Sequence, residues 1–541
     1  MGTWAGRGLQ AGCLATLLAA CAAQHKGPPP STDIDETGFR DDVRTLASDE
    51  FEGRKPGTPG EEQTVAFLIA QYRKLHLEPG NGDSYLQRVP LVEILAGEDA
   101  TLSAAGRGST RQLRYGKDMV IWTRRPVPAV QLAQSELVFA GYGIVAPEYQ
   151  WNDYAQLDVR GKTVLVMVGD PGNAGKDQVL FKGSSMTHYG TVAYKFEEAA
   201  RQGAAGVLLI HDPLATGYGW NAVASGWTGP QLDLARTGEE EGGAAIEGWL
   251  ANETARGLFD QAGLDYEAQA RAASRRGFKA MVMGLKIEGE IHNTIRRFSS
   301  SNVIGLLRGG QHRHEYVVYA AHWDHLGRDS RGAIHNGAVE NATGVAGLLM
   351  LAQSFHRTRP PPDRSIVFIA FTAEESGLLG SAYYVENPVF PLRQTAGMLN
   401  LDGLHVGGRT RDVLVFGAGN SDLEEYVRSA ALLQGREVRP ELHPEQGLYF
   451  RSDQYNFARH GVPALYFGAG IDDSARGPAS GRAQLEDYMA HRYRQPSDKY
   501  TEDWDVRGAL DDLTLYYEVG DRLARTRRFP RWYPNSEFSE D

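Results

Sequence analysis

Apolar residues recur at helical spacing near the start of the chain, after a short stretch rich in proline. Phe39, Val43 and Leu46 fall on one face of a helix, and positions 65–75 repeat this pattern. Between them, the sequence PGTPG at 56–60 predicts a loop because proline and glycine interrupt helices. We therefore expect two helices at the beginning of the folded body.

The middle of the chain alternates short apolar runs with loops that contain glycine. The runs at 137–140, 163–168 and 206–210 have the length and composition of strands. A helical pattern at 194–201 ends before Gly203 and leads into the third run. This region is predicted to be a separate module that combines helices with many strands.

In the last part of the chain, longer apolar segments predicted as strands alternate with predicted helices. Strands are expected at 316–320, 366–371, 397–401 and 464–467, with a helix at 343–355. Such alternation is typical of α/β proteins with a mainly parallel sheet between helices. We expect a mixed, mainly parallel sheet flanked by helices.

The length and net charge of the chain limit its domain organisation and its possible partners. A chain of 541 residues exceeds one ordinary core, so more than one packed unit is expected. The formal net charge of -12 argues against a nucleic-acid partner, because phosphate binding needs a clustered basic excess.

The amino-terminal segment predicts an export signal. Arg7 precedes an apolar stretch at 9–20 that is shorter than the ~20 residues of a membrane-spanning helix. The sequence LAAC at 18–21 resembles the bacterial lipobox, in which the signal is removed before the cysteine and that cysteine is acylated. Cys21 would then anchor the chain by lipid, and Ala22 favours the outer membrane, facing the periplasm. The alternative is a secretory signal with an incidental cysteine.

Histidines and carboxylates follow three of the predicted strands directly. In open α/β sheets, functional groups gather at the carboxyl ends of strands. Zinc accepts imidazole nitrogen and carboxylate oxygen, so these side chains together predict a zinc site. The side chains after the strands at 316–320, 366–371 and 397–401 are His322, Asp324, His325, Glu374, Glu375 and Asp402.

The residue types also suggest a division of roles. An aspartate two residues after a ligand histidine can orient its imidazole, which is the role expected of Asp324. Glu374 and Glu375 are adjacent and cannot both point the same way, so one can bind metal while the other acts as general base. Taken singly, His-X-Asp is also typical of a surface hydrogen bond, and a glutamate pair of a solvated helix start.

Four segments together resemble the ordered motifs of the di-zinc aminopeptidase family, metallopeptidase family twenty-eight. They are AHWDHLG at 321–327, NGAVENATG at 336–344, TAEESGLLGS at 372–381 and NLD at 400–402. The segment at 46–54 is similar to the amino-terminal part of bacterial members, and 194–210 to the family's protease-associated domain. The resemblance spans 38–525.

The resemblance implies a catalytic site and an activity. His322 and Asp402 would hold one zinc ion, Glu375 would help to hold a second, and Glu340 would stand at the bridging position. Glu374 would be the general base that takes a proton from water. The implied reaction is hydrolysis of amino-terminal residues from peptide substrates.

The chain departs from the family at three positions. The family has aspartate at the position of Glu340, a histidine ligand at Arg494 and commonly histidine at Gln454. Arginine cannot ligate a metal because its guanidinium stays protonated. His491 is the one nearby histidine that could replace the lost ligand. We therefore expect one firmly bound zinc ion and at most two.

The departures leave other functions open. One is a peptide- or protein-binding lipoprotein with impaired or no catalysis, and another is a single-zinc enzyme similar to glutaminyl cyclases. The expected parts are a signal peptide at 1–20, a lipidated linker at 21–37, a first peptidase segment at 38–95, an inserted protease-associated domain at 96–291, the metal-site part of the peptidase domain at 292–526 and a tail at 527–541.

Overall fold

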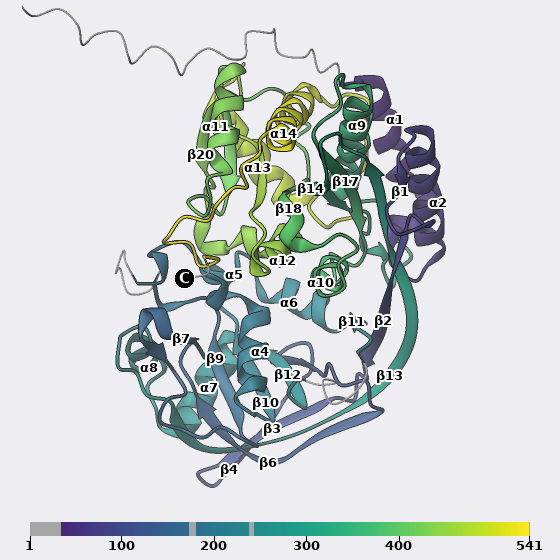
Figure 1. Cartoon of the computed structure of the whole chain (residues 1–541). Helices are drawn as coiled ribbons and strands as arrows, with labels where there is room; N and C mark the ends of the chain where they lie inside the picture. Colours follow the sequence, from purple (N-terminus) through teal and green to yellow (C-terminus); the bar gives the residue numbers. More distant parts are fainter. Residues whose placement is uncertain (1–33, 173–179, 237–242, 540–541) are drawn as a thin grey trace, which may run out of the picture. The chain divides into compact units, whose positions relative to one another are not determined.

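The structure is a computed structural model that describes residues 34–172, 180–236 and 243–539 (Figure 1). The predicted signal peptide and the proposed acylation site, Cys21, lie outside the described residues. Within the described ranges, no helix is both long enough and apolar enough to cross a bilayer.

Two helices open the described chain, α1 (Glu36–Leu46) and α2 (Pro59–Lys74). Helix α1 begins at Glu36, so the last two residues of the linker predicted at 21–37 are helical. The reason is an N-cap, because the Asp35 carboxylate accepts a hydrogen bond from the Gly38 backbone N–H at 3.0 Å. Helix α2 starts at a proline, whose fixed backbone angle suits the first helical position.

Four parallel strands form the centre of the carboxyl-terminal sheet. In their order across the sheet they are β17 (Arg364–Phe371), β14 (His312–His322), β18 (Thr395–Asn400) and β21 (Ala464–Ala469). Antiparallel strands flank them, with β13 (Met281–Leu307) beside β17 and β19 (Asp412–Phe416) beside β21, followed by β20 (Glu437–Pro440). The α/β class with a mixed, mainly parallel sheet is confirmed.

Both faces of this sheet are covered, which explains why its strands are continuously apolar. Alternate residues of a strand point to opposite faces. Val317 and Tyr319 of β14 pack in one core with α1, α9 and α14, whereas Val318 packs in another with α10 and α12 (Figure 1). These helices are α9 (Gly344–Arg357), α14 (Arg507–Arg525), α10 (Leu379–Glu386) and α12 (Gln454–Arg459), and α11 (Glu424–Leu433) and α13 (Pro478–His491) complete this part.

The middle region has a sheet and cores of its own. Its strands, in order, are β4 (Ser109–Leu113), β3 (Thr101–Gly106), β13, β6 (Ala129–Phe139), β9 (Thr163–Met167), β10 (Gly206–Ile210), β12 (Ile246–Leu250) and β5 (Met119–Trp122). Its helices are α4 (Val192–Arg201), α5 (Pro213–Thr216), α6 (Trp220–Trp227), α7 (Asn252–Ala262) and α8 (Tyr266–Ala273).

Two long strands connect this region to the carboxyl-terminal sheet. Strand β13 has 27 residues and pairs along much of its length with β2 (Leu86–Ala96). The first predicted boundary of the insert falls at the end of this ladder, where Ala96 lies opposite Asn293. The second, after Ile291, lies within β13, where this strand pairs with β6. Strand β13 therefore runs without a break from the middle region into the carboxyl-terminal sheet.

Candidate metal centre

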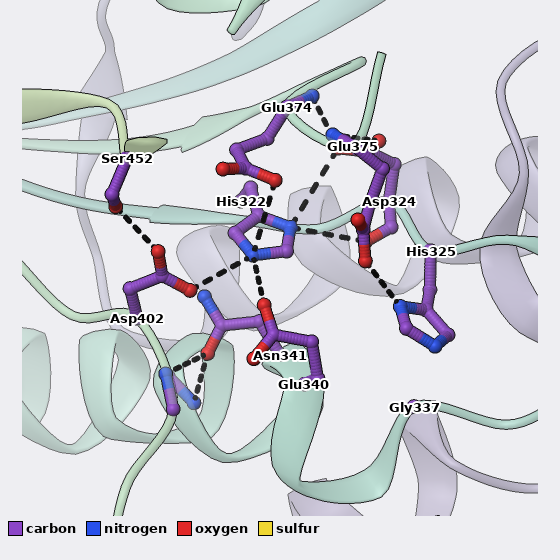
Figure 2. Close-up of polar contacts among 12 residues, drawn as sticks. His322, Asp324, His325, Gly337, Glu340, Asn341, Glu374, Glu375, Asp402 and Ser452 are labelled. Carbon is purple, nitrogen blue, oxygen red and sulfur yellow. Dashed lines mark hydrogen bonds and ion pairs between the residues drawn. The ribbon is translucent and has the colours of Figure 1, made fainter. Parts of the chain in front are cut away.

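Three side chains from separate elements meet at the carboxyl end of the parallel strands (Figure 2). His322 ends β14, Asp402 follows β18, and Glu340 lies in the helical turn before α9. The His322 Nε2 atom lies 3.2 Å from Glu340 Oε1 and 3.1 Å from Asp402 Oδ1. All three donor atoms lie within 4.8 Å of one another.

This donor set fits one zinc ion. Tetrahedral zinc with ligands at about 2.0 Å places neighbouring donors about 3.3 Å apart, close to the observed spacing. One imidazole and two carboxylates also match the three protein ligands of a catalytic zinc site. Glu340 is held from behind, because the Asp498 carboxylate accepts a hydrogen bond from its backbone N–H at 3.1 Å.

The charges of the cluster favour a bound cation. Burial raises the pKa of Glu340 to about 8, and the charge of Asp402 adds to this rise. Burial acts to lower the pKa of His322, but nearby carboxylates outweigh it and raise this pKa well above its ordinary value. A divalent cation would neutralise the buried carboxylates in place of this proton.

The Asp324 carboxylate was expected to orient the His322 imidazole, but the backbone oxygen of Asp324 is the atom in contact with it. The His322 Nδ1 atom lies 3.1 Å from the Asp324 backbone oxygen and 3.8 Å from the nearer carboxylate oxygen. An N–H at Nδ1 that donates to this carbonyl leaves the Nε2 lone pair for metal. The Asp324 carboxylate instead accepts from the backbone N–H groups of Glu374 and Glu375 at 3.0 and 3.3 Å.

The side chains of the adjacent glutamates point in different directions, as the sequence predicted. Ala373 has a φ of +52°, a left-handed conformation that turns the chain sharply after β17. Glu374 is buried with Oε2 3.8 Å from His322 Nε2, and this oxygen has no hydrogen-bond partner among the described residues. Burial raises the pKa of Glu374 well above its ordinary value. This carboxylate is therefore placed to exchange a proton beside the three-residue cluster.

Glu375 contacts two side chains, those of His325 and Arg494. Its Oε1 lies 2.7 Å from His325 Nδ1, and its Oε2 lies 2.5 Å from Arg494 Nη2. Burial acts to raise the pKa of Glu375, but the charge of Arg494 and the hydrogen bond from His325 outweigh it and hold the pKa below its usual range. Since a guanidinium cannot ligate and repels a cation, these residues do not fit a second zinc ion.

His325 was not assigned a role from the sequence, although it stands one residue after Asp324. Its ring reaches Glu375 only because Gly337 leaves room for it. Gly337 has a φ of +58°, and a Cβ atom there would lie 2.6 Å from the ring (Figure 2). Burial lowers the pKa of His325 to about 4, so the ring is neutral at pH 7. In the sequence, only the second histidine of the segment AHWDHLG indicated that His325 could contact Glu375.

The other two candidate positions lie outside the ligand set. His491 is 72% exposed in its side chain and pairs with Asp487 at 3.1 Å, so it does not replace the missing ligand in this conformation. Gln454 is buried behind the site, where it accepts from Asn400 at 2.9 Å and donates to the Tyr449 carbonyl at 2.6 Å. It supports the strand end that carries Asp402.

Comparisons with known proteins show likeness to peptidases. The family model for Peptidase family M28 matches residues 302–517. Aminopeptidase YwaD of Bacillus subtilis is 37% identical over 340 residues, which are 62% of this chain and 54% of that protein. Mouse aminopeptidase NAALADL1 is 34% identical over 124 residues, 22% of this chain and 16% of that protein. The chain thus spans about half or less of these relatives.

A solved structure extends the likeness over most of the fold. The aminopeptidase from Aneurinibacillus sp. strain AM-1 has a TM-score of 0.52 at 20% identity, covering 92% of this chain and 95% of that one. At this identity, the likeness concerns the fold.

Proposed function

We propose that the chain is a zinc-dependent aminopeptidase that works with one metal ion, since residues 302–517 match the model for Peptidase family M28. The observation that carries the proposal is the cluster of His322, Glu340 and Asp402 beside the unpartnered carboxylate of Glu374. The names of the relatives support aminopeptidase action, and the donor set supports one zinc ion.

The residues divide the work of peptide hydrolysis. Zinc at this site would supply a Lewis acid that polarises the carbonyl and makes water more acidic. Glu374 takes a proton from the water whose oxygen attacks the peptide carbonyl carbon. When the carbon–nitrogen bond breaks, Glu374 returns this proton to the leaving nitrogen. His322, Glu340 and Asp402 would hold the zinc ion beside Glu374.

Arg494 supports a second candidate function, a peptide-binding protein with impaired catalysis. A single zinc ion lacks the clamp that two ions provide for attacking and leaving atoms. The proposed lipid anchor at Cys21 would hold either protein at the outer membrane, facing the periplasm, and it rests on the lipobox-like sequence alone.

Release of amino acids from a panel of aminoacyl amides tests the proposal. The zinc-loaded protein should release an amino-terminal residue, and Glu374→Gln should not, although it binds the same amount of zinc. Release by neither protein, with zinc bound to both, would favour the peptide-binding function.

A further inference from the structure

Arg54 is a fully buried arginine that takes no part in the proposed chemistry. It ends the short helix η1 (Asp49–Arg54), where Gly53 and Arg54 have φ angles of +69° and +53°. A Cβ atom at Gly53 would lie 2.4 Å from the His335 carbonyl oxygen, so glycine allows the two backbone segments to approach closely. From this turn, the Arg54 side chain enters the interior.

The guanidinium of Arg54 donates hydrogen bonds to four backbone carbonyls. Its Nε lies 2.9 Å from the oxygen of Trp323, and its Nη2 lies 2.9 Å from the oxygen of Gly337. Its Nη1 lies 2.6 Å from the oxygen of Asn336 and 2.7 Å from that of Leu46, the last residue of α1. Since a guanidinium has five N–H donors, most of its donors are used on the backbone.

These bonds join two segments that carry proposed metal ligands. Trp323 directly follows His322, the ligand that ends β14. Gly337 stands three residues before Glu340, in the turn that leads to this ligand. Because both segments are bonded to one planar, rigid guanidinium, the Arg54 side chain limits how far they can move relative to each other.

A carboxylate holds the same turn through its N–H groups. Asp498 is buried and accepts hydrogen bonds from the backbone N–H groups of Val339 and Glu340, all at 3.1 Å. The segment 336–340 is therefore bonded to a buried cation through its carbonyls and to a buried carboxylate through its N–H groups. Neither Arg54 nor Asp498 belongs to the cluster of three donor atoms.

We propose that Arg54 is a positioning residue for the metal centre. Together with Asp498, it sets the place of the Glu340 carboxylate. A glutamate side chain rotates about several bonds, so a fixed backbone helps to keep its Oε1 at 3.2 Å from His322 Nε2. The inference rests on the proposed function in one respect, that the cluster binds zinc, and it does not require hydrolysis.

The zinc affinity of Arg54→Lys, measured by competition with a chelator, tests this role. Lysine keeps the positive charge but carries its donors on a single nitrogen, which cannot reproduce the planar fork. We expect the Kd for zinc to rise about tenfold or more, as is typical when the support of a metal ligand is lost.

Arg364→Lys is the matched control. Arg364 is equally buried, donates to the carbonyls of Leu523 and Arg527, and pairs with Glu315. It stands at the start of β17, the end of the parallel strands opposite the metal centre. The control should lose stability in thermal unfolding and keep the zinc affinity of the wild type.

The visible spectrum of the cobalt-loaded proteins separates positioning from a general loss of stability, because it depends on the geometry of the metal ligands. Below the unfolding temperatures, the spectrum should change in Arg54→Lys and stay unchanged in Arg364→Lys. Asp498→Asn is the second variant, and it decides the question if Arg54→Lys does not fold. It leaves Arg54 in place and should also weaken zinc binding and change the spectrum.

Three results would overturn the positioning role. They are wild-type zinc affinity with an unchanged cobalt spectrum in folded Arg54→Lys, the same result in Asp498→Asn if Arg54→Lys does not fold, and equal losses of affinity in Arg54→Lys and Arg364→Lys. A wild-type protein that binds zinc but releases no amino acid would contradict the proposed hydrolase function and leave the positioning role intact. A wild-type protein that binds no zinc would contradict both.

Discussion

Arg494 and Glu375 form an ion pair beside the metal centre, with 2.5 Å between Nη2 and Oε2. The Glu375 side chain is only 4% exposed, and its other oxygen is bound to His325. On the proposed one-metal function, the pair would keep Glu375 from binding a second metal ion. The pair does not involve His322, Glu340 or Asp402, which form a separate cluster.

Glu374→Gln should abolish hydrolysis without removing zinc. The amide cannot accept the proton of water, so the rate of amino-acid release should fall at least about a hundredfold. The matched change Glu375→Gln should keep measurable hydrolysis, because Glu375 contacts Arg494 and His325 rather than the three proposed ligands. Release assays and metal analysis of both variants check this assignment. Loss of zinc in Glu374→Gln would show that Glu374 is a ligand.

Glu375→Gln should destabilise the protein more than it affects the metal. It leaves the Arg494 guanidinium without its carboxylate partner, and a loss of about 1–3 kcal/mol in the free energy of unfolding is expected when a charged group loses a buried partner. Denaturant unfolding measures the loss, and Glu486→Gln, at an exposed position of α13, is the control. Unchanged stability with lost zinc would instead identify Glu375 as a ligand.

Gly337→Ala should disturb the site without removing any polar group from it. The added methyl group would lie 2.2 Å from the Glu340 carbonyl oxygen and 2.6 Å from the His325 ring, at a φ that favours glycine. We expect weaker zinc binding and a lower unfolding temperature, measured by competition with a chelator and by thermal unfolding. Wild-type zinc affinity in this variant would mean that the turn before Glu340 does not position the ligand.

The carboxyl-terminal tail should lose stability in acid. Glu537 is buried, with Oε1 3.1 Å from Lys182 Nζ and Oε2 2.8 Å from His188 Nδ1. Burial acts to raise the pKa of Glu537, but the hydrogen bond from His188 and the charge of Lys182 outweigh it and lower the pKa. Its stabilisation is therefore complete above the unfolded-state pKa of about 4.3 and is lost as pH falls through the lower folded pKa.

Thermal unfolding of Glu537→Gln across pH tests this linkage. The variant should melt several degrees below the wild type at pH 7, and the difference should shrink towards pH 3. A difference that is constant with pH would indicate that the charge of Glu537 contributes nothing.

The lipid anchor is tested by the intact mass of the mature amino terminus. We expect the first residue to be Cys21 with attached acyl chains, because the LAAC sequence ends a short apolar segment. An unmodified terminus that begins at another residue would contradict the anchor.

The sequence predicted the positions of His322, Glu374 and Asp402 because each follows a strand, and parallel strands bring their carboxyl ends together. The pairing of Arg494 with Glu375 follows from the resemblance to the family, which puts Arg494 where a ligand histidine would stand beside that carboxylate, whereas the strand pattern alone does not bring these distant segments together. The role of Asp324 was also hidden, since His322 contacts its backbone oxygen and a sequence pattern shows only side chains. Helix α1 starts at Glu36 because Asp35 caps it. The proline-rich segment before it led to the prediction that the linker extends to position 37.

The zinc content of the purified protein tests the single-metal site most directly. After incubation with excess zinc and removal of loosely bound metal, we expect one tightly bound zinc ion per wild-type chain. Arg494→His should raise this number towards two, because it replaces a fixed cation with an imidazole ligand beside Glu375. Two tightly bound zinc ions in the wild-type protein would contradict the single-metal site, and the ion pair between Arg494 and Glu375 would then have to open when metal binds.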